Sequence, residues 1–213
     1  MIKPLLCVSI VLAVLSGCSS TASDVRRVVS QTDLRSAQGV TIALQAEGLQ
    51  RTFQDSSEIF TLRSSSREVE TLATGVIEYM GFQLSSTSQA DYILRLKQVS
   101  PDGGACNDLA DSAELDISYS LSLLTFGVFP TTQVHCILAV VELYANFGTE
   151  PELMGEFFSD AGSVEIYGGA RNIQNYQGLV RKEDEIKGIE QSLGSVLAEI
   201  IDEGAFTVYK RAF

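Results

Sequence analysis

Apolar and polar residues alternate in several stretches of this chain, as they do in strands with one buried face. These stretches are residues 40–47, 90–97 and 115–123, and further strands are predicted over residues 133–147 and, as one or two strands, over residues 153–167. The run from Ile137 to Val141 is apolar at every position. We therefore expect it to form a central strand that is covered on both faces.

Helical spacing replaces this alternation in two places. Ser65 and Glu68 form a capping box, and the apolar residues after it fall on one helical face as far as Met80, where Gly81 predicts a left-handed stop. A second stripe predicts a helix over residues 183–203, with acidic residues in its first turn and Gly204 at its end. Leu72 and Leu193 are central in the two stripes, so we expect each to be almost fully buried.

The order of these elements predicts an α+β fold. We expect residues 39–213 to form one domain, a single mixed and largely antiparallel sheet with two main helices packed on one face. Residues 101–112 are rich in Gly and Asp and predict a loop, and residues 206–209 predict a closing strand.

The N-terminus has the layout of a secretory signal, with Lys3 followed by apolar residues 5–15. This apolar stretch is shorter than the roughly 20 residues that cross a bilayer. Leu15-Ser16-Gly17-Cys18 resembles the lipobox of bacterial lipoproteins. The resemblance implies that residues 1–17 are a signal peptide and that Cys18 becomes an acylated first residue.

Such an anchor is stable, because two or more acyl chains (palmitate among them) hold a protein on a bilayer where one does not. In that family an aspartate after the cysteine commonly retains the protein in the inner membrane. Ser19 therefore implies the outer membrane, on its periplasmic face. Residues 18–38 are expected to be the lipidated terminus and a flexible tether.

The body of the chain has a second resemblance. Gly81-Phe82 followed by Ala90-Asp91 resembles small α+β envelope lipoproteins, among them lipopolysaccharide-transport and curli-secretion-like lipoproteins. It covers residues 65–98 and includes no diagnostic motif of either group, so it transfers no functional residue.

The net charge excludes some partners. The chain has a formal charge of −12, and removal of Lys3 with the signal leaves 14 Lys and Arg against 27 Asp and Glu, or −13. A nucleic-acid-binding protein needs a basic footprint, and docking on anionic lipid head groups needs basic residues as well. We therefore expect no nucleic-acid partner and no electrostatic docking on lipid head groups, and we expect contact with the bilayer through acylated Cys18.

Cys106 and Cys136 are the cysteines that remain after Cys7 leaves with the signal and Cys18 is acylated. In an oxidising compartment an even number of cysteines predicts a disulfide, and two buried free thiols are the alternative. His135 lies beside Cys136, but the sequence around Cys106 does not match a cysteine peptidase, and these three side chains are too few for a typical zinc site.

Other chemistry has weak support. Asp102, Asn107, Asp108 and Asp111 are oxygen ligands that calcium would accept, but their spacing is not that of an EF-hand. We expect no catalytic residue, metal or cofactor. Apolar residues gather at one predicted turn, where they indicate a contact with a partner or the membrane, or a surface that the C-terminal helix or the tether covers. They are Leu124, Phe126, Val128 and Phe129.

Together these features predict a non-enzymatic accessory or binding subunit of an envelope assembly or transport system, with an envelope protein as its partner. One alternative is a cell-wall-active enzyme or inhibitor that uses carboxylates such as Glu142, Glu150 or Glu152. The other is a structural or stress-related lipoprotein without a dedicated ligand.

Overall fold

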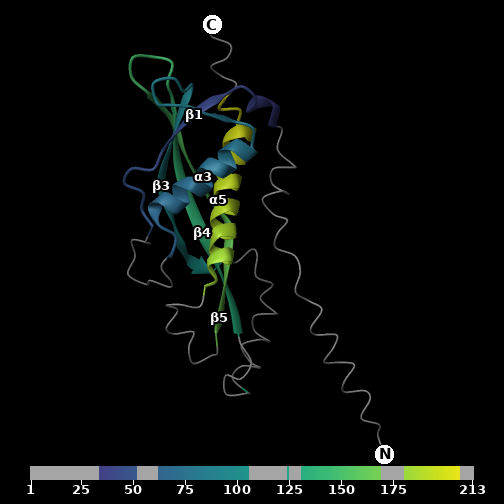
Figure 1. Ribbon diagram of the computed structural model, residues 1–213. Helices are drawn as coiled ribbons and strands as arrows, with labels where there is room; N and C mark the ends of the chain where they lie inside the picture. The colour runs from purple at the N-terminus through teal and green to yellow at the C-terminus, as the bar shows by residue number, and fades with distance from the viewer. Residues whose placement is uncertain (1–33, 52–61, 106–123, 125–130, 169–179, 207–213) are drawn as a thin grey trace, which may run out of the picture.

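Five strands pair into one sheet, and two long α-helices cover one of its faces (Figure 1). The structure is a computed structural model that describes residues 34–51, 62–105, 124, 131–168 and 180–206. Its strands are β1 (Thr41–Gln45), β2 (Gln83–Leu84), β3 (Tyr92–Ala105), β4 (Thr131–Ala145) and β5 (Glu152–Gly168). Its helices are α3 (Ser66–Tyr79) and α5 (Lys182–Asp202), and a short 3-10 helix, η1 (Leu34–Ser36), precedes β1.

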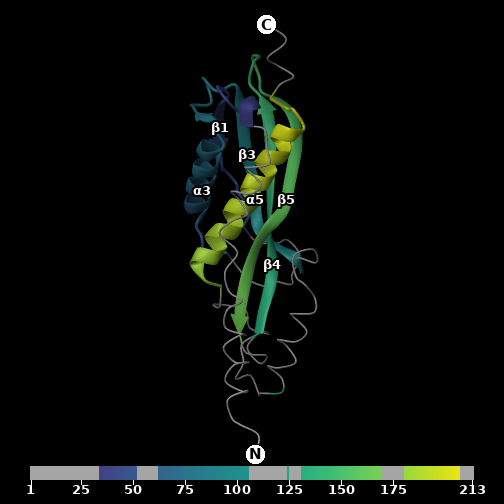
Figure 2. The same ribbon diagram turned by 90° about the vertical axis from the view of Figure 1, so that its right-hand side faces the viewer.

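The strand order is β2-β1-β3-β4-β5. β1 runs parallel to β2 and β3, whereas β4 pairs antiparallel with both β3 and β5. The predicted fold class, a mixed and largely antiparallel sheet with two helices on one face, is therefore confirmed. Figure 2 shows α5 across the front of β4 and β5 and α3 beside β1 and β3, and both helices bury side chains in the same core.

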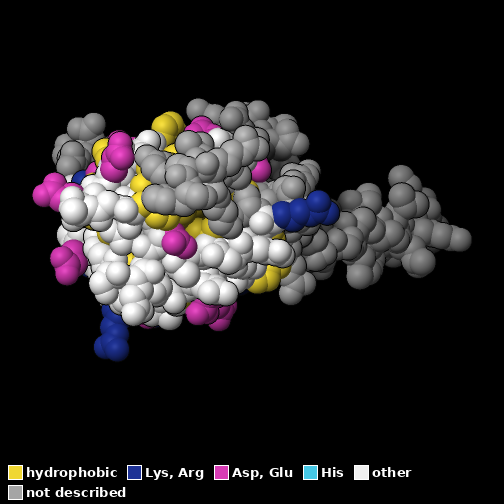
Figure 3. Space-filling model, turned by 90° about the horizontal axis from the view of Figure 1, so that it is seen from above, with side chains coloured by type: hydrophobic (Ala, Val, Ile, Leu, Met, Phe, Trp, Pro, Cys, Tyr) yellow, Lys and Arg dark blue, Asp and Glu magenta, His cyan; other side chains and the backbone are white. Residues whose placement is uncertain are grey.

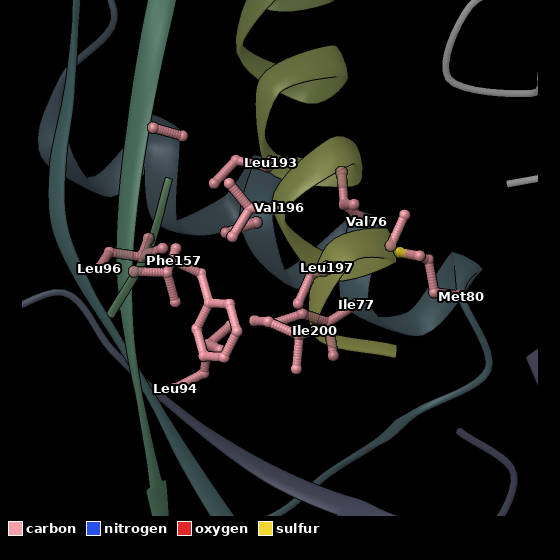
Figure 4. Close-up of a cluster of buried hydrophobic side chains, with 14 of the residues drawn as sticks. Val76, Ile77, Met80, Leu94, Leu96, Phe157, Leu193, Val196, Leu197 and Ile200 are labelled. Atoms are coloured by element: carbon pink, nitrogen blue, oxygen red, sulfur yellow. The ribbon is translucent and has the colours of Figure 1, made fainter. Parts of the chain in front are cut away.

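The core lies between the helices and the sheet (Figure 4). Val76 and Ile77 of α3 and Met80, the residue that caps its C-terminus, form one cluster with side chains of α5 and of the sheet. The other labelled side chains of this cluster are Leu94, Leu96, Phe157, Leu193, Val196, Leu197 and Ile200. Burying these side chains is the main source of stability for the fold, at roughly 1.5–3 kcal/mol for each large one.

The predicted capping box and stop of α3 are both present. The Glu68 carboxylate accepts a hydrogen bond from the Ser65 backbone N–H at 2.7 Å, and the Ser65 hydroxyl oxygen accepts one from the Glu68 N–H at 3.2 Å. Gly81 has a φ of 91°, the left-handed conformation that ends the helix. The prediction for Leu72 was wrong: the helix turns Val69, Ala73, Val76 and Ile77 into the core and leaves Leu72 half-buried at its margin.

The first turn of α5 is attached to the chain that leads into α3. The Glu185 carboxylate is fully buried and accepts hydrogen bonds from the backbone N–H groups of Ser64, at 2.8 Å, and Arg63, at 3.0 Å. Lys182 forms an ion pair with Glu68 of the capping box. These contacts fix the start of α5 against the start of α3, which allows the two helices to pack as one layer.

The prediction that β4 is covered on both faces was wrong. Its residues alternate: Ile137, Ala139, Val141 and Leu143 are buried under the helices. The residues between them, from Leu138 to Tyr144, are only half-buried on the opposite face. No helix of the described residues covers that face, so an apolar run did not mean burial on both sides.

Other boundaries also differ from those predicted. Ala37 is fully buried and Leu34 packs on the core, so the domain already includes the last residues of the predicted tether. Residues 101–105 continue strand β3 and are not a loop. Phe206 follows α5 in a turn and packs edge-on against Tyr92, while residues 207–209 and the strand predicted over 115–123 lie outside the described residues.

Candidate functional site

The face of the sheet that the helices leave uncovered is the main candidate surface, and we call it the open face. Paired residues of neighbouring strands share a face, so the register assigns its residues directly. They are Ile93, Arg95 and Lys97 of β3, Val140, Glu142 and Tyr144 of β4, and Leu153, Glu156 and Phe158 of β5.

A network of polar groups occupies the centre of the open face. The Glu142 carboxylate lies 3.1 Å from the Lys97 ammonium and 3.6 Å from the Arg95 guanidinium, and it accepts a 2.8 Å hydrogen bond from the Tyr144 hydroxyl. Arg95 also donates to the Tyr144 hydroxyl oxygen at 3.2 Å and to the Gln45 side-chain oxygen at 3.4 Å. Its guanidinium lies 5.0 Å from the centre of the Tyr144 ring. The network therefore joins β1, β3 and β4.

These contacts shift the pKa values of Glu142 and Tyr144. The hydrogen bond from Tyr144 lowers the pKa of Glu142, and Lys97 and Arg95 lower it further, against the opposing effect of burial. The same hydrogen bond raises the pKa of Tyr144. At neutral pH Glu142 is an ionised carboxylate with its lone pairs engaged, which is the state of a structural anion and not of a proton donor.

Apolar side chains lie beside this network, on β5. Phe158 is 67 % exposed and Leu153 is 53 % exposed. Phe158 pairs with the half-buried Val140 of β4, and Leu153 pairs with Tyr144. Exposed apolar side chains that adjoin a polar network are typical of protein contact surfaces, whereas a single exposed Leu is not.

β5 also carries a row of carboxylates. Glu156 and Asp160 are exposed, and neither has a basic partner among the described residues. Figure 3, which views the molecule from above Figure 1, shows acidic side chains spread around that end and few basic ones. Glu156 and Asp160 lie two residues before and two residues after Phe158, so β5 is acidic on either side of this exposed ring.

The predicted disulfide is described only in part. Cys136 is buried and disulfide-bonded, and it is the only cysteine among the described residues, so its partner lies outside them. Ala105 and His135, which immediately precede Cys106 and Cys136 in the chain, are paired across β3 and β4. A disulfide leaves Cys136 no thiolate, so it cannot serve as a zinc ligand.

Most other predicted site residues lie outside the described residues, including Cys18, Cys106, Phe126, Val128 and Phe129. Leu124 is described, and its side chain is 76 % exposed. Of the proposed calcium ligands, Asp102 belongs to β3, and Asn107, Asp108 and Asp111 are not described. Within the described residues, no group of three His, Cys, Asp or Glu side chains could hold a metal ion.

The carboxylates of the enzyme alternative do not form a pair. Glu142 pairs with Glu156 on the open face, whereas Glu152 pairs with Ala145, whose side chain belongs to the core on the other face. Glu150 lies in the exposed turn between β4 and β5. A glycosidase needs two carboxylates on either side of one bond, so Glu142 and Glu152 do not meet that requirement.

The open face was not predicted from the sequence, although the sequence contains one signal for it. Phe157 and Phe158 are adjacent in a strand, so one ring must point to each face of the sheet. Phe157 is buried under the helices and Phe158 is exposed.

Among the described residues, no helix has the length and apolarity needed to cross a membrane. No protein-family model matches this chain, and the comparison with curated proteins found no match.

Proposed function

We propose that this protein is a lipid-anchored, non-enzymatic binding subunit in a bacterial cell envelope, and that it contacts an envelope protein through the open face and strand β5. The observation that carries the proposal is that helices cover only one face of the sheet among the described residues. Both described helices lie on one face, which leaves Phe158 and Leu153 exposed beside the Arg95–Glu142 network.

The anchor rests on the lipobox that ends at Cys18. An acylated Cys18 would hold the domain at the outer membrane, facing the periplasm, for the reason given for Ser19. Binding at a membrane surface also benefits from tethering, because an anchored domain meets partners in the same membrane at a high effective concentration.

The polar network supports a binding role over a catalytic one. Every charged group in it is engaged: Glu142 by two cations and a hydroxyl, and Arg95 by Glu142, Tyr144 and Gln45. A network of this kind holds side chains in fixed positions on a surface. It offers a partner a pre-formed set of charges next to apolar side chains.

In vivo photo-crosslinking tests the proposal. The photoreactive amino acid p-benzoylphenylalanine would replace Phe158 in one strain and Leu153 in another, and adducts would be identified by mass spectrometry. Tyr79, an aromatic residue on α3 that is 55 % exposed, is the matched control position. We expect the same envelope protein in adducts from Phe158 and Leu153, none from Tyr79, and loss of the adduct when Cys18→Ala releases the domain from the membrane. Identical adducts from all three positions would contradict the proposal.

A further inference from the structure

Three rows of paired residues cross the open face, and each row stops at β5. Their composition differs: one row is apolar with an aromatic residue, one is charged, and one changes from polar to apolar. The rows are Ile93–Tyr144–Leu153, Arg95–Glu142–Glu156 and Gln98–Val140–Phe158.

The charged row is incomplete at its β5 end. Arg95 pairs with Glu142, and Glu142 pairs with Glu156, so the order of charge across the strands is positive, negative, negative. Like charges directly opposite each other destabilise a sheet. Arg95 and Lys97 compensate Glu142, but Glu156 has no basic partner in the part of the chain that the structure describes. A basic side chain at the next position outward would compensate Glu156.

The row Gln98–Val140–Phe158 is also incomplete at its β5 end. Phe158 has Val140 as its cross-strand neighbour on the β4 side, and its side chain is largely exposed. A further strand beside β5 would place one of its own side chains next to this ring, since cross-strand neighbours lie about 4.5–5.5 Å apart. An apolar side chain there would remove much of the Phe158 ring from water.

β5 is also the outer strand of the sheet in the described residues, and it is 17 residues long. Natural proteins protect such edges with Lys, Pro, bulges or short strands. β5 contains no Lys, Arg or Pro. Its register against β4 is irregular in two places, between Leu153 and Gly155 and between Ser159 and Gly162. At the second, the Ser159 hydroxyl accepts a hydrogen bond from the Ala161 N–H at 3.2 Å. The stretch from Gly155 to Ser159 therefore remains a regular edge.

We propose that β5 accepts an extended segment of a partner protein as a sixth strand, and that this segment has the pattern basic–x–apolar–x–basic. Its basic side chains would face Glu156 and Asp160, and its apolar side chain would face Phe158. Main-chain hydrogen bonds to the β5 edge provide affinity in this mode of recognition, and the alternate side chains provide specificity.

A second copy of this chain fits the edge poorly. If two β5 strands paired antiparallel about Phe158, Glu156 of each copy would face Asp160 of the other. All charged residues of β5 are acidic, so this pairing would add like-charge contacts and relieve none. The charge on β5 therefore favours a basic partner over self-association.

Peptide binding to the full-length chain, purified in detergent, tests the inference, which rests on the binding role proposed above. The probe is a fluorescent peptide with the core Lys-Thr-Phe-Thr-Lys, followed by anisotropy. One control peptide replaces both Lys with Glu, and a second replaces both Thr with Pro, which prevents strand pairing. We expect saturable binding of the first peptide only, with slowed amide exchange in β5.

Charge reversal makes the test specific to β5. The double variant Glu156→Lys/Asp160→Lys should weaken binding of the basic peptide on the order of tenfold or more and should bind the acidic peptide instead. Glu70→Lys/Glu78→Lys changes two exposed residues of α3 by the same net charge and should leave both affinities unchanged. Phe158→Ala should weaken the basic peptide without any gain for the acidic one.

Three results would overturn the inference: equal binding of both peptides, binding that survives the β5 reversal, or a dimer in ultracentrifugation that the reversal abolishes while no peptide binds. The last result would assign the edge to a second copy. Failure of the peptides while the Phe158 crosslink to an envelope protein persists would reject strand addition and leave the proposed function standing. Peptide binding without any envelope crosslink would reject the proposed function and leave strand addition standing.

Discussion

Gly162 of β5 and Gly188 of α5 meet backbone against backbone. A Cβ atom on Gly162 would lie 1.9 Å from the Gly188 carbonyl oxygen, and one on Gly188 would lie 2.7 Å from the Ser163 carbonyl oxygen. One turn further along α5, the buried Ser192 hydroxyl lies within hydrogen-bond distance of the carbonyl oxygens of Ile137, at 2.8 Å, and Ser159, at 2.7 Å. The helix therefore sits directly on the irregular part of the β4–β5 pair.

Gly162→Ala should lower the free energy of unfolding by about 3 kcal/mol or more, because the added methyl meets a backbone carbonyl that cannot move aside without shifting the helix. Urea unfolding of the purified protein measures this. Gly75→Ala is the matched control: Gly75 lies in α3 with no atom within 4 Å of its Cβ position, so alanine there should stabilise the protein by about 0.5–1 kcal/mol. Equal unfolding midpoints for the two variants would show that α5 does not rest on β5 at this point.

Leu193→Ala and Leu72→Ala should lower the free energy of unfolding by different amounts. Leu193 is 2 % exposed in the core, so its truncation should cost about 2–5 kcal/mol. Leu72 is half-buried at the edge of α3, so its truncation should cost about 1–2 kcal/mol, since less apolar surface is lost. Thermal or urea unfolding separates the two. A Leu193→Ala protein that unfolds like the wild type would mean that α5 is not docked in solution.

Cys106 is expected to be the disulfide partner of Cys136. The pairing of Ala105 with His135 brings the two chain segments together, and a bridge would close a loop of about 30 residues. Peptide mapping under non-reducing conditions should recover one linked peptide that contains both cysteines. Cys106→Ser should then cost about 3–4 kcal/mol of stability, whereas reduction of that variant should have no further effect. Labelling of Cys106 as a free thiol in the oxidised protein would reject the bridge.

Acidification should destabilise the protein through His135, the only histidine in the chain. Burial lowers the pKa of His135 below 6.5, so the unfolded state binds a proton more readily than the folded state. Its contribution to stability is present above about pH 6.5 and is lost as the pH falls toward the lower folded pKa.

The test compares the wild type with His135→Gln between about pH 7.5 and about pH 5.5. The wild type should lose stability relative to the variant over this range. Burial raises the pKa of Glu190, which acts in the opposite direction, but it does so in both proteins and leaves the difference unaffected. Parallel curves for the two proteins would contradict the assignment.

Cys18→Ala should leave the precursor uncleaved or move the protein out of the outer-membrane fraction, because the variant has no thiol to acylate. Fractionation, immunoblotting and mass spectrometry of the N-terminal peptide measure this. Cys7→Ala, which lies within the predicted signal peptide, is the control and should be processed normally. Normal processing and fractionation of Cys18→Ala would remove the basis for the lipoprotein proposal.

Much of the local structure could be predicted because its signals act between neighbours in the chain. The Ser65–Glu68 capping box, the stop at Gly81 and the alternating runs of β1 and β3 each depend on contacts within a few residues. The α+β class followed from the order of these elements. The short strand β2 was not predicted, because two residues are too few to show an alternation of apolar and polar positions.

Burial depends instead on where an element lies among elements that are distant in the chain. Glu183, Asp184 and Glu185 are equivalent by any local rule, yet only Glu185 is fully buried, because the rotation of α5 points it at the backbone of Arg63 and Ser64. Phe157 and Phe158 are likewise identical neighbours, and the side of the sheet on which the helices pack decides which ring enters the core. The spacing of apolar residues shows that a helix or strand has two different faces. Packing against elements distant in the chain decides which of those faces is exposed to water.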